Sequence, residues 1–149
     1  MLTQKIMPTT LLLISILMML TLHFLLPLMK IIPPFWNLLG LLPIIIGVYI
    51  NLWADHAFHQ VQTTIKPYER PSTLIVHGCF SYTRNPMYLG FVLVLIGIAI
   101  LIMTLSPWVV IPLFIVILDT LYIPHEEQML TEEFGSLWEG YKKQVHRWI

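Results

Sequence analysis

The chain has 149 residues, of which 57% are hydrophobic and only 11% are charged, and its formal net charge is zero. Soluble domains carry about a quarter charged residues, so this composition excludes an ordinary soluble domain and indicates one integral membrane domain over residues 1–149. A neutral chain gives no sign of a nucleic-acid partner. The single cysteine, Cys79, excludes an internal disulfide and is interpreted as a small packing residue.

Four apolar runs are long enough to cross a bilayer, which requires about 20 residues of helix. They cover about residues 8–28, 35–58, 86–105 and 108–123. The first run loosely mimics a signal peptide but lacks a small-residue cleavage site, so we expect it to be retained. Backbone groups in lipid must bond to one another, which requires helices. The short connections predict an all-α fold of two antiparallel hairpins, joined by a cytoplasmic loop over residues 59–85.

The basic residues predict the direction of the spans. With the N-terminus inside, seven of the eight basic residues lie on the inner side and only Lys30 lies outside. Such a bias in short connections marks the cytoplasmic side, so both termini are expected in the cytoplasm. The inner seven are Lys5, Lys66, Arg70, Arg84, Lys142, Lys143 and Arg147.

An amphipathic helix is expected after Pro124, over about residues 125–146. Its apolar residues recur at spacings of three and four, which places them on one face of a helix. That face would lie on the cytoplasmic surface or in the membrane interface, where Trp148 would also be at home. The predicted face consists of Leu130, Phe134, Leu137, Tyr141 and Val145.

A polar cluster, Arg84-Asn85-Pro86-Met87-Tyr88, stands at the start of the third run. Pro86 suits the first turn of a helix, and Asn85 before it is a good helix cap. One interpretation is a capped helix start with a snorkelling arginine and an interfacial tyrosine. The other is a helix N-terminus that offers free N–H groups to an anionic ligand. The local sequence leaves both open.

A second polar cluster, His125-Glu126-Glu127, follows the fourth run. The two carboxylates either compensate the helix dipole or hold a cation. Asp119 lies within the run, where an ionisable residue suggests function, and its spacing from Tyr122 and Glu126 predicts one shared face. Asp119 is alternatively a structural partner of Asn51 or His56.

Other polar and small residues favour structural roles. Asp55, His56 and His59 close the second run and are interpreted as an interfacial polar group, and no metal site is predicted. His23 is expected at a helix–helix contact. Gly90 and Gly97 lie seven residues apart, which favours close helix packing. The chain has no glycine-rich phosphate loop and no paired metal motif.

Several of these segments resemble the isoprenylcysteine carboxyl methyltransferases. The resemblance is closer still to their short bacterial relatives, which also resemble the phospholipid N-methyltransferases. It covers about residues 70–149 and implies a bacterial inner membrane. The segments that carry it are Leu74-Ile75-Val76-His77-Gly78, residues 84–90, Glu126-Glu127, Phe134-Gly135 and Tyr141-Lys142-Lys143.

The resemblance implies S-adenosylmethionine bound between the last two spans and the C-terminal helix. Glu126 would hold the amino group of the cofactor, and Arg84, Glu127 and Asp119 are the candidate catalytic residues. If the acceptor is an amine, Glu127 or Asp119 would take its proton. The other residues expected at the cofactor are Ser72, Thr73, Leu74, Ile75, His77, Phe80, Asn85, Pro86, Met87 and Tyr88.

Three positions depart from the family pattern. Asn85 and Ser72 stand where the family has histidine, and Tyr122 stands where the prenylcysteine enzymes have an arginine that contacts the substrate carboxylate. The leading hypothesis is therefore methyl transfer to a small lipophilic acceptor at the cytoplasmic face. Alternatives are phospholipid amine N-methylation, isoprenylcysteine-type carboxyl O-methylation and, in another class, a non-catalytic membrane subunit or small transporter. The sequence names neither the acceptor nor the oligomeric state.

Overall fold

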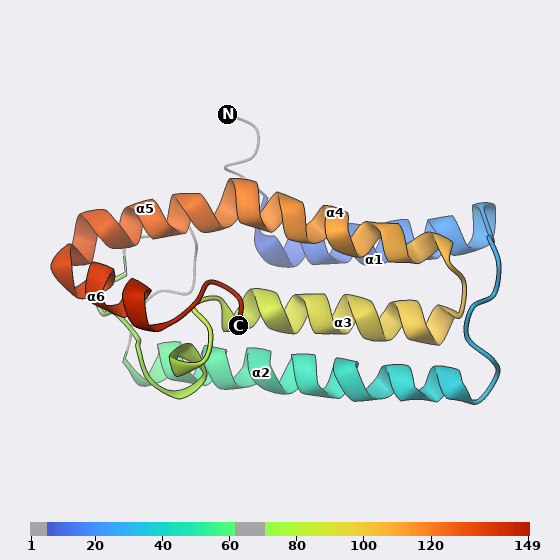
Figure 1. The fold of residues 1–149 in the computed structure, drawn as a ribbon, viewed down its shortest axis with the longest axis horizontal. Helices are drawn as coiled ribbons and strands as arrows, with labels where there is room; N and C mark the ends of the chain where they lie inside the picture. Colours follow the sequence, from blue (N-terminus) through green and yellow to red (C-terminus); the bar gives the residue numbers. More distant parts are fainter. Residues whose placement is uncertain (1–5, 62–70) are drawn as a thin grey trace.

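The computed structural model describes residues 6–61 and 71–149, and this part of the chain is helical with no strand elements. Figure 1 shows the apolar helices α1, α2, α3 and α4 side by side, each antiparallel to the one before it. Their bounds are Pro8–Leu25 for α1, Leu41–Gln60 for α2, Pro86–Ile102 for α3 and Val110–Ile117 for α4. Short helical turns, η2 (Trp36–Gly40), η3 (Gly78–Ser81) and η4 (Ser106–Val109), precede three of them.

Length and hydropathy identify three candidate membrane spans in the described residues: Pro8–Leu25, Trp36–Gln60 and Ser106–Phe134. Only 17% of the first two is buried inside the molecule, so most of their apolar side chains face outward, as lipid contact requires. The apolar helix α3 has 17 residues, of which eight are buried, and Leu95 and Ala99 among them are fully buried. The all-helical, membrane-type fold is confirmed, whereas a fourth span over α3 stays a prediction.

The main interface between helices joins α2 to α3 and depends on glycine. A Cβ atom built on Gly47 would lie 2.5 Å from the carbonyl oxygen of Gly90, and one built on Gly40 would meet the carbonyl oxygen of Gly97 closer still. Backbones this close exclude side chains, as in other membrane helix pairs with small residues. The packing role expected of Gly90 and Gly97 is therefore confirmed. The contact joins the two expected hairpins to each other, across the 61–85 connection.

The α1–α2 connection and the α3–α4 connection lie at the same end of the bundle and bond to each other. The N–H of Ile31 donates to the carbonyl of Met103 at 2.9 Å, and the N–H of Leu105 donates to that of Met29 at 3.2 Å. Nearby, Nδ1 of His23 lies 3.0 Å from the buried hydroxyl of Thr104. His23 thus joins α1 to the α3–α4 connection, which agrees with the expected contact between helices.

The fourth apolar helix does not end near residue 123. It continues through a π-helical turn, η5 (Leu118–Tyr122), into α5 (Ile123–Phe134), and the expected boundary at Pro124 is wrong. Proline in a helix interior lacks an N–H and crowds the preceding turn. Here Pro124 lies two residues after the end of a wider π turn, a type of bulge that inserts one residue. The helix ends instead at Gly135, which has φ +50°.

The single C-terminal helix expected over 125–146 is therefore two helices, α5 and α6 (Ser136–Gln144), with a turn at Gly135. The turn changes which side chains face inward. Leu137 is 69% exposed, whereas Trp138, outside the predicted apolar face, is only 2% exposed. Trp148 packs back on the bundle and is not a free interfacial anchor.

We predict that Gly97→Ala destabilises the bundle. The added methyl group would lie 2.5 Å from Cγ1 of Ile44 and nearer still to the carbonyl oxygen of Gly40, and overpacking of this kind costs about 1–3 kcal/mol. Thermal unfolding in detergent should show a lower Tm. The matched control is Gly140→Ala in α6, where an added Cβ meets nothing within 4 Å. Equal Tm values for the two variants would contradict the close-packing interpretation.

Candidate functional site

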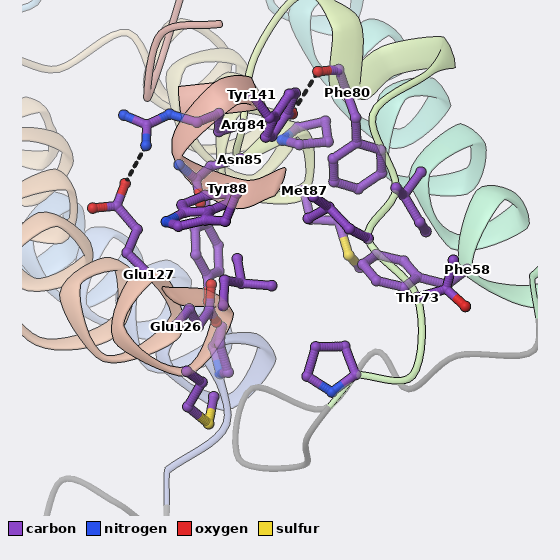
Figure 2. Close-up of a pocket in the computed structure, with 18 of the residues that line it drawn as sticks. Phe58, Thr73, Phe80, Arg84, Asn85, Met87, Tyr88, Glu126, Glu127 and Tyr141 are labelled. Atoms are coloured by element: carbon purple, nitrogen blue, oxygen red, sulfur yellow. Dashed lines mark hydrogen bonds and ion pairs between the residues drawn. The ribbon is translucent and has the colours of Figure 1, made fainter. Parts of the chain in front are cut away.

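A cavity of about 260 Å³ lies at one end of the bundle, where the starts of α1 and α3, helices α5 and α6 and the segment before η3 meet. Figure 2 shows Glu126, Glu127 and Arg84 on one side of it and Phe58, Thr73 and Met87 on another. Its size is near the lower end of small-molecule sites. The other lining residues come from α1 (Met7, Pro8, Thr9), from 71–80 (Pro71, Leu74, Ile75, Phe80), and from the helices (Asn85, Pro86, Tyr88, Phe91, Met129, Leu130, Trp138, Tyr141).

Most residues singled out from the sequence line this one cavity, although they come from segments 40 residues apart. Four do not line it: Ser72 and His77, which are exposed, and Asp119 and Tyr122. The hydroxyl of Tyr122 instead donates to the carbonyl of Ile6 at 2.9 Å. The residues brought together are Thr73, Leu74, Ile75, Phe80, Arg84, Asn85, Pro86, Met87, Tyr88, Glu126 and Glu127.

The start of α3 is bonded to the segment that follows α6. Pro86 is the first residue of α3, but the side chain of Asn85 does not cap it. Its Nδ2 donates to the carbonyl of Arg147 at 2.9 Å, and the N–H of Arg84 donates to the carbonyl of His146 at 3.0 Å. The side-chain cap that one of the two interpretations of this cluster assumed is therefore not observed, because the Asn85 side chain donates to a backbone carbonyl of residues 145–148 instead.

Glu126 lines the cavity and accepts a hydrogen bond from the hydroxyl of Tyr88, which is itself buried. The two side chains come from α5 and α3, so this bond fixes the carboxylate across the helix interface. A buried carboxylate needs such partners because water no longer solvates it.

Glu127 bridges two arginines. Its Oε1 lies 2.9 Å from Nη1 of Arg84, while Arg147 donates to both oxygens, from Nε to Oε1 at 3.2 Å and from Nη2 to Oε2 at 2.7 Å. Side chains of Arg84 and Glu127 are only 10% and 14% exposed. Two-pronged contact between arginine and carboxylate is the strongest form of such a pair. The bonds with Glu127 raise the pKa of Arg147 further, so this guanidinium stays charged.

Asp119 joins the same network from outside the cavity. Its Oδ1 accepts from Nη1 of Arg147 at 3.0 Å and lies 3.4 Å from the indole nitrogen of Trp148. The spacing predicted that Asp119 shares a face with Glu126. The extra residue of the π turn rotates the helix, so Asp119 instead shares a face with Glu127, and both contact Arg147.

The expected partners of Asp119 have other bonds. The Nδ2 of Asn51 donates to the carbonyl of Gly47 at 2.9 Å, and His56 pairs with Gln60 at 3.0 Å. Asp55 lies 3.5 Å from His59 on the exposed end of α2. Within the described residues, no group of three or more His, Cys, Asp or Glu side chains is arranged to hold a metal ion.

Aromatic side chains form the wall behind Arg84. The guanidinium carbon of Arg84 lies 5.5 Å from the ring centroid of Trp138, within the range of cation–π attraction. The hydroxyl of Tyr141 donates to the carbonyl of Phe80 at 2.6 Å, and Phe80 meets Phe58 edge to face at 5.5 Å. Burial raises the pKa of Tyr141 to about 12, so this hydroxyl remains a donor at physiological pH.

Sequence reasoning missed three members of this site: Arg147, Trp138 and Phe58. Arg147 was noted only as one of seven inner cations, and no local spacing connects it to Glu127. Trp138 and Phe58 gave no polar signal, and Trp138 lies outside the apolar face that the helical period predicted. Their roles follow from long-range packing.

Comparison with known proteins agrees with the geometry. The sequence pattern of the family described as phospholipid methyltransferase matches residues 35–136, from η2 to the start of α6. The chain belongs to this family. The resemblance inferred from the sequence is thereby confirmed, and the matched range extends it to α2, which the quoted motifs did not cover.

Curated relatives of this phospholipid methyltransferase family member carry the name isoprenylcysteine O-methyltransferase. A "Probable protein-S-isoprenylcysteine O-methyltransferase" from Oryza sativa is 30% identical over 75% of the chain, which covers 60% of the rice protein. A protein-S-isoprenylcysteine O-methyltransferase from Saccharomyces cerevisiae is 32% identical over 73% of the chain and 46% of the yeast protein. The chain thus spans about half the length of these relatives, and no solved structure matches it.

We predict that Tyr141→Phe lowers the Tm in detergent. The variant leaves the carbonyl of Phe80 without its donor, and a buried group left unsatisfied costs about 1–3 kcal/mol. Tyr82→Phe is the control, because Tyr82 is 74% exposed. If Tyr141→Phe and Tyr82→Phe melt alike, the bond does not hold the α6 wall against η3.

Proposed function

We propose that the protein is an S-adenosylmethionine-dependent methyltransferase that acts on a small lipophilic acceptor at the membrane surface. One observation carries the proposal: a cavity at the end of an apolar bundle is lined by two carboxylates, an arginine and several aromatic rings. Membership of the phospholipid methyltransferase family and the names of the relatives support the reaction class.

The residues fit the chemical groups of this cofactor. Its amino-acid part carries an ammonium, which Glu126 complements, and a carboxylate, which Arg84 complements. Two buried donors, Nε of Arg84 and Nε1 of Trp138, have no hydrogen-bond partner among the described residues. Buried donors are normally paired, so a ligand acceptor would satisfy them. Phe80, Tyr141 and Trp138 offer ring faces to the adenine.

When bound, S-adenosylmethionine would supply a methyl group on a positively charged sulfur, which is by its own chemistry already activated for transfer. The protein therefore has mainly to orient the two reactants, and orientation alone contributes up to about 7–11 kcal/mol. Tyr88 holds the Glu126 carboxylate in place across the α3–α5 interface. For an amine acceptor, Glu127 lines the cavity and is the candidate base. Asp119 lies outside the cavity and is not proposed to take a proton.

The acceptor is proposed to reach the cavity from lipid. Met7 and Pro8 of the α1 start, Met87 and Phe91 of α3 and Met129 of α5 give the cavity an apolar side. Arg147 is bonded to Glu127 and Asp119, Arg84 would be taken by the carboxylate of the cofactor, and Tyr122, which replaces the family arginine, bonds to Ile6. A free carboxylate on the acceptor would find no unpaired cation there, which favours a lipid amine or hydroxyl over a prenylcysteine.

The orientation proposed from the basic residues places this end of the bundle in the cytoplasm of a bacterial inner membrane, with both termini inside. Single cysteines at positions 31 and 136, in a Cys79→Ala background, should react with an impermeant maleimide from opposite sides of the membrane. Position 136 should react only from the cytoplasmic side, and labelling of position 136 from outside would refute this orientation.

We predict that Glu126→Gln weakens binding of S-adenosylhomocysteine to the purified protein. A charge-assisted bond contributes about 1.5–3 kcal/mol, so calorimetry should show a Kd about 10-fold to 100-fold higher. Glu139→Gln on exposed α6 is the control and should bind like the unchanged protein. Equal affinity of Glu126→Gln would mean that Glu126 serves only the helix start. Absence of binding to the unchanged protein would favour a non-catalytic subunit.

We also predict that methylation with radiolabelled cofactor is faster on a total lipid extract than on N-acetyl-farnesylcysteine. The reason is the lack of an unpaired cation for the carboxylate of the farnesyl compound. Methyl transfer would be followed as label extracted into organic solvent. Rapid labelling of the farnesyl compound and none of the lipid would instead support the carboxyl O-methylation named for the rice and yeast relatives.

A further inference from the structure

Residues 145–148 return from α6 across the start of α3. Three of the bonds that hold them use backbone carbonyls of this segment: the carbonyl of His146 accepts from the N–H of Arg84, and the carbonyl of Arg147 accepts from Asn85 and, at 3.2 Å, from Thr83. These bonds do not involve the side chain of Arg147. The segment is therefore anchored independently of that guanidinium, which raises the question of what the guanidinium does.

All three nitrogen atoms of the Arg147 guanidinium donate hydrogen bonds to two carboxylates. Nε and Nη2 donate to Glu127, and Nη1 donates to Asp119. Arg84, by contrast, reaches Glu127 through Nη1 alone, and its buried Nε has no partner within the described part of the chain. Charges in this cluster sum to zero, because two arginines face two carboxylates.

Removal of the Arg147 charge would leave Glu127 with Arg84 as its one cationic partner in the cluster. A partly buried carboxylate needs a compensating charge, so Arg84 would be drawn to both oxygens of Glu127 and away from the cavity. With Arg147 present, Glu127 is already neutralised, and the guanidinium carbon of Arg84 lies 5.5 Å from the ring centroid of Trp138, which lines the same cavity.

We propose that Arg147 is a positioning residue of the site: it neutralises Glu127, and so keeps Arg84 available to bind an anionic ligand group in the cavity. This inference rests on the proposed function, because it takes that group to be the carboxylate of the bound cofactor. It assigns to residues 145–148 a part in ligand affinity, in addition to their packing against α3.

Calorimetry with two ligands tests the inference. S-adenosylhomocysteine carries the carboxylate, whereas 5′-methylthioadenosine lacks the whole amino-acid part. Arg147→Gln should weaken binding of the first about tenfold, as expected for one charge-assisted bond, and change binding of the second less than about twofold. Arg147→Lys keeps the charge without the two-pronged geometry and should lose less, again only for the first ligand. Lys143→Gln, on the exposed side of α6, is the control.

A double-mutant cycle separates this role from a purely structural one. If Arg147 acts through the charge of Glu127, Arg147→Gln should have almost no effect in a Glu127→Gln background. Equal losses for both ligands, equal losses in both backgrounds, or unchanged affinity for S-adenosylhomocysteine would overturn the proposal. If Arg147→Gln fails to fold, the ligand selectivity of Arg147→Lys decides. Failure of the unchanged protein to bind either ligand would refute the proposed function instead.

Discussion

The close contact between α2 and α3 underlies the rest of this structure. Gly40 and Gly47 meet Gly97 and Gly90 backbone to backbone, so α3 is held at a fixed depth along α2. In lipid the hydrophobic effect does not drive helices together, and packing of small residues takes its place. The start of α3 carries Arg84 to Tyr88, and its position therefore depends on a contact several turns away in the apolar part of the bundle. Phe58, near the end of α2, is brought to the same cavity by that contact.

At the polar end of the bundle, hydrogen bonds and ion pairs of Glu126 and Glu127 fix the side chains around the cavity. Glu126 and Glu127 are adjacent in sequence but have different surroundings: Glu126 bonds to a tyrosine and faces the cavity, whereas Glu127 forms ion pairs with two arginines. The two neighbouring carboxylates thus have different roles: Glu126 is proposed to bind a ligand group, whereas Glu127 is paired with the surrounding cations. The division follows from the helix itself, because consecutive residues point about 100° apart around its axis.

Sequence reasoning succeeded where the signal was local. The proline at the start of α3, the polar clusters and the apolar runs each depend on neighbouring residues, and the cavity indeed brings both clusters together. It failed where a backbone irregularity changed the helical phase. The π turn moved Asp119 from the face of Glu126 to that of Glu127. The helix break at Gly135 turned Trp138 into the core in place of Leu137, which is exposed. Arg147 was missed for another reason: 20 residues and a helix break separate it from Glu127, and no period connects them.

The unbroken helix from Ser106 to Phe134 has a geometrical consequence. At 1.5 Å per residue, the distance along it from Ser106 to Glu126 is about 30 Å, which equals the thickness of the hydrocarbon core of a bilayer. The length of this helix therefore matches the hydrocarbon core: when Ser106 lies at one boundary of the core, Glu126 lies at the other. Under the proposed function, a water-soluble cofactor and a lipid-dissolved acceptor would then meet at this boundary, whose depth depends on the number of residues in this helix.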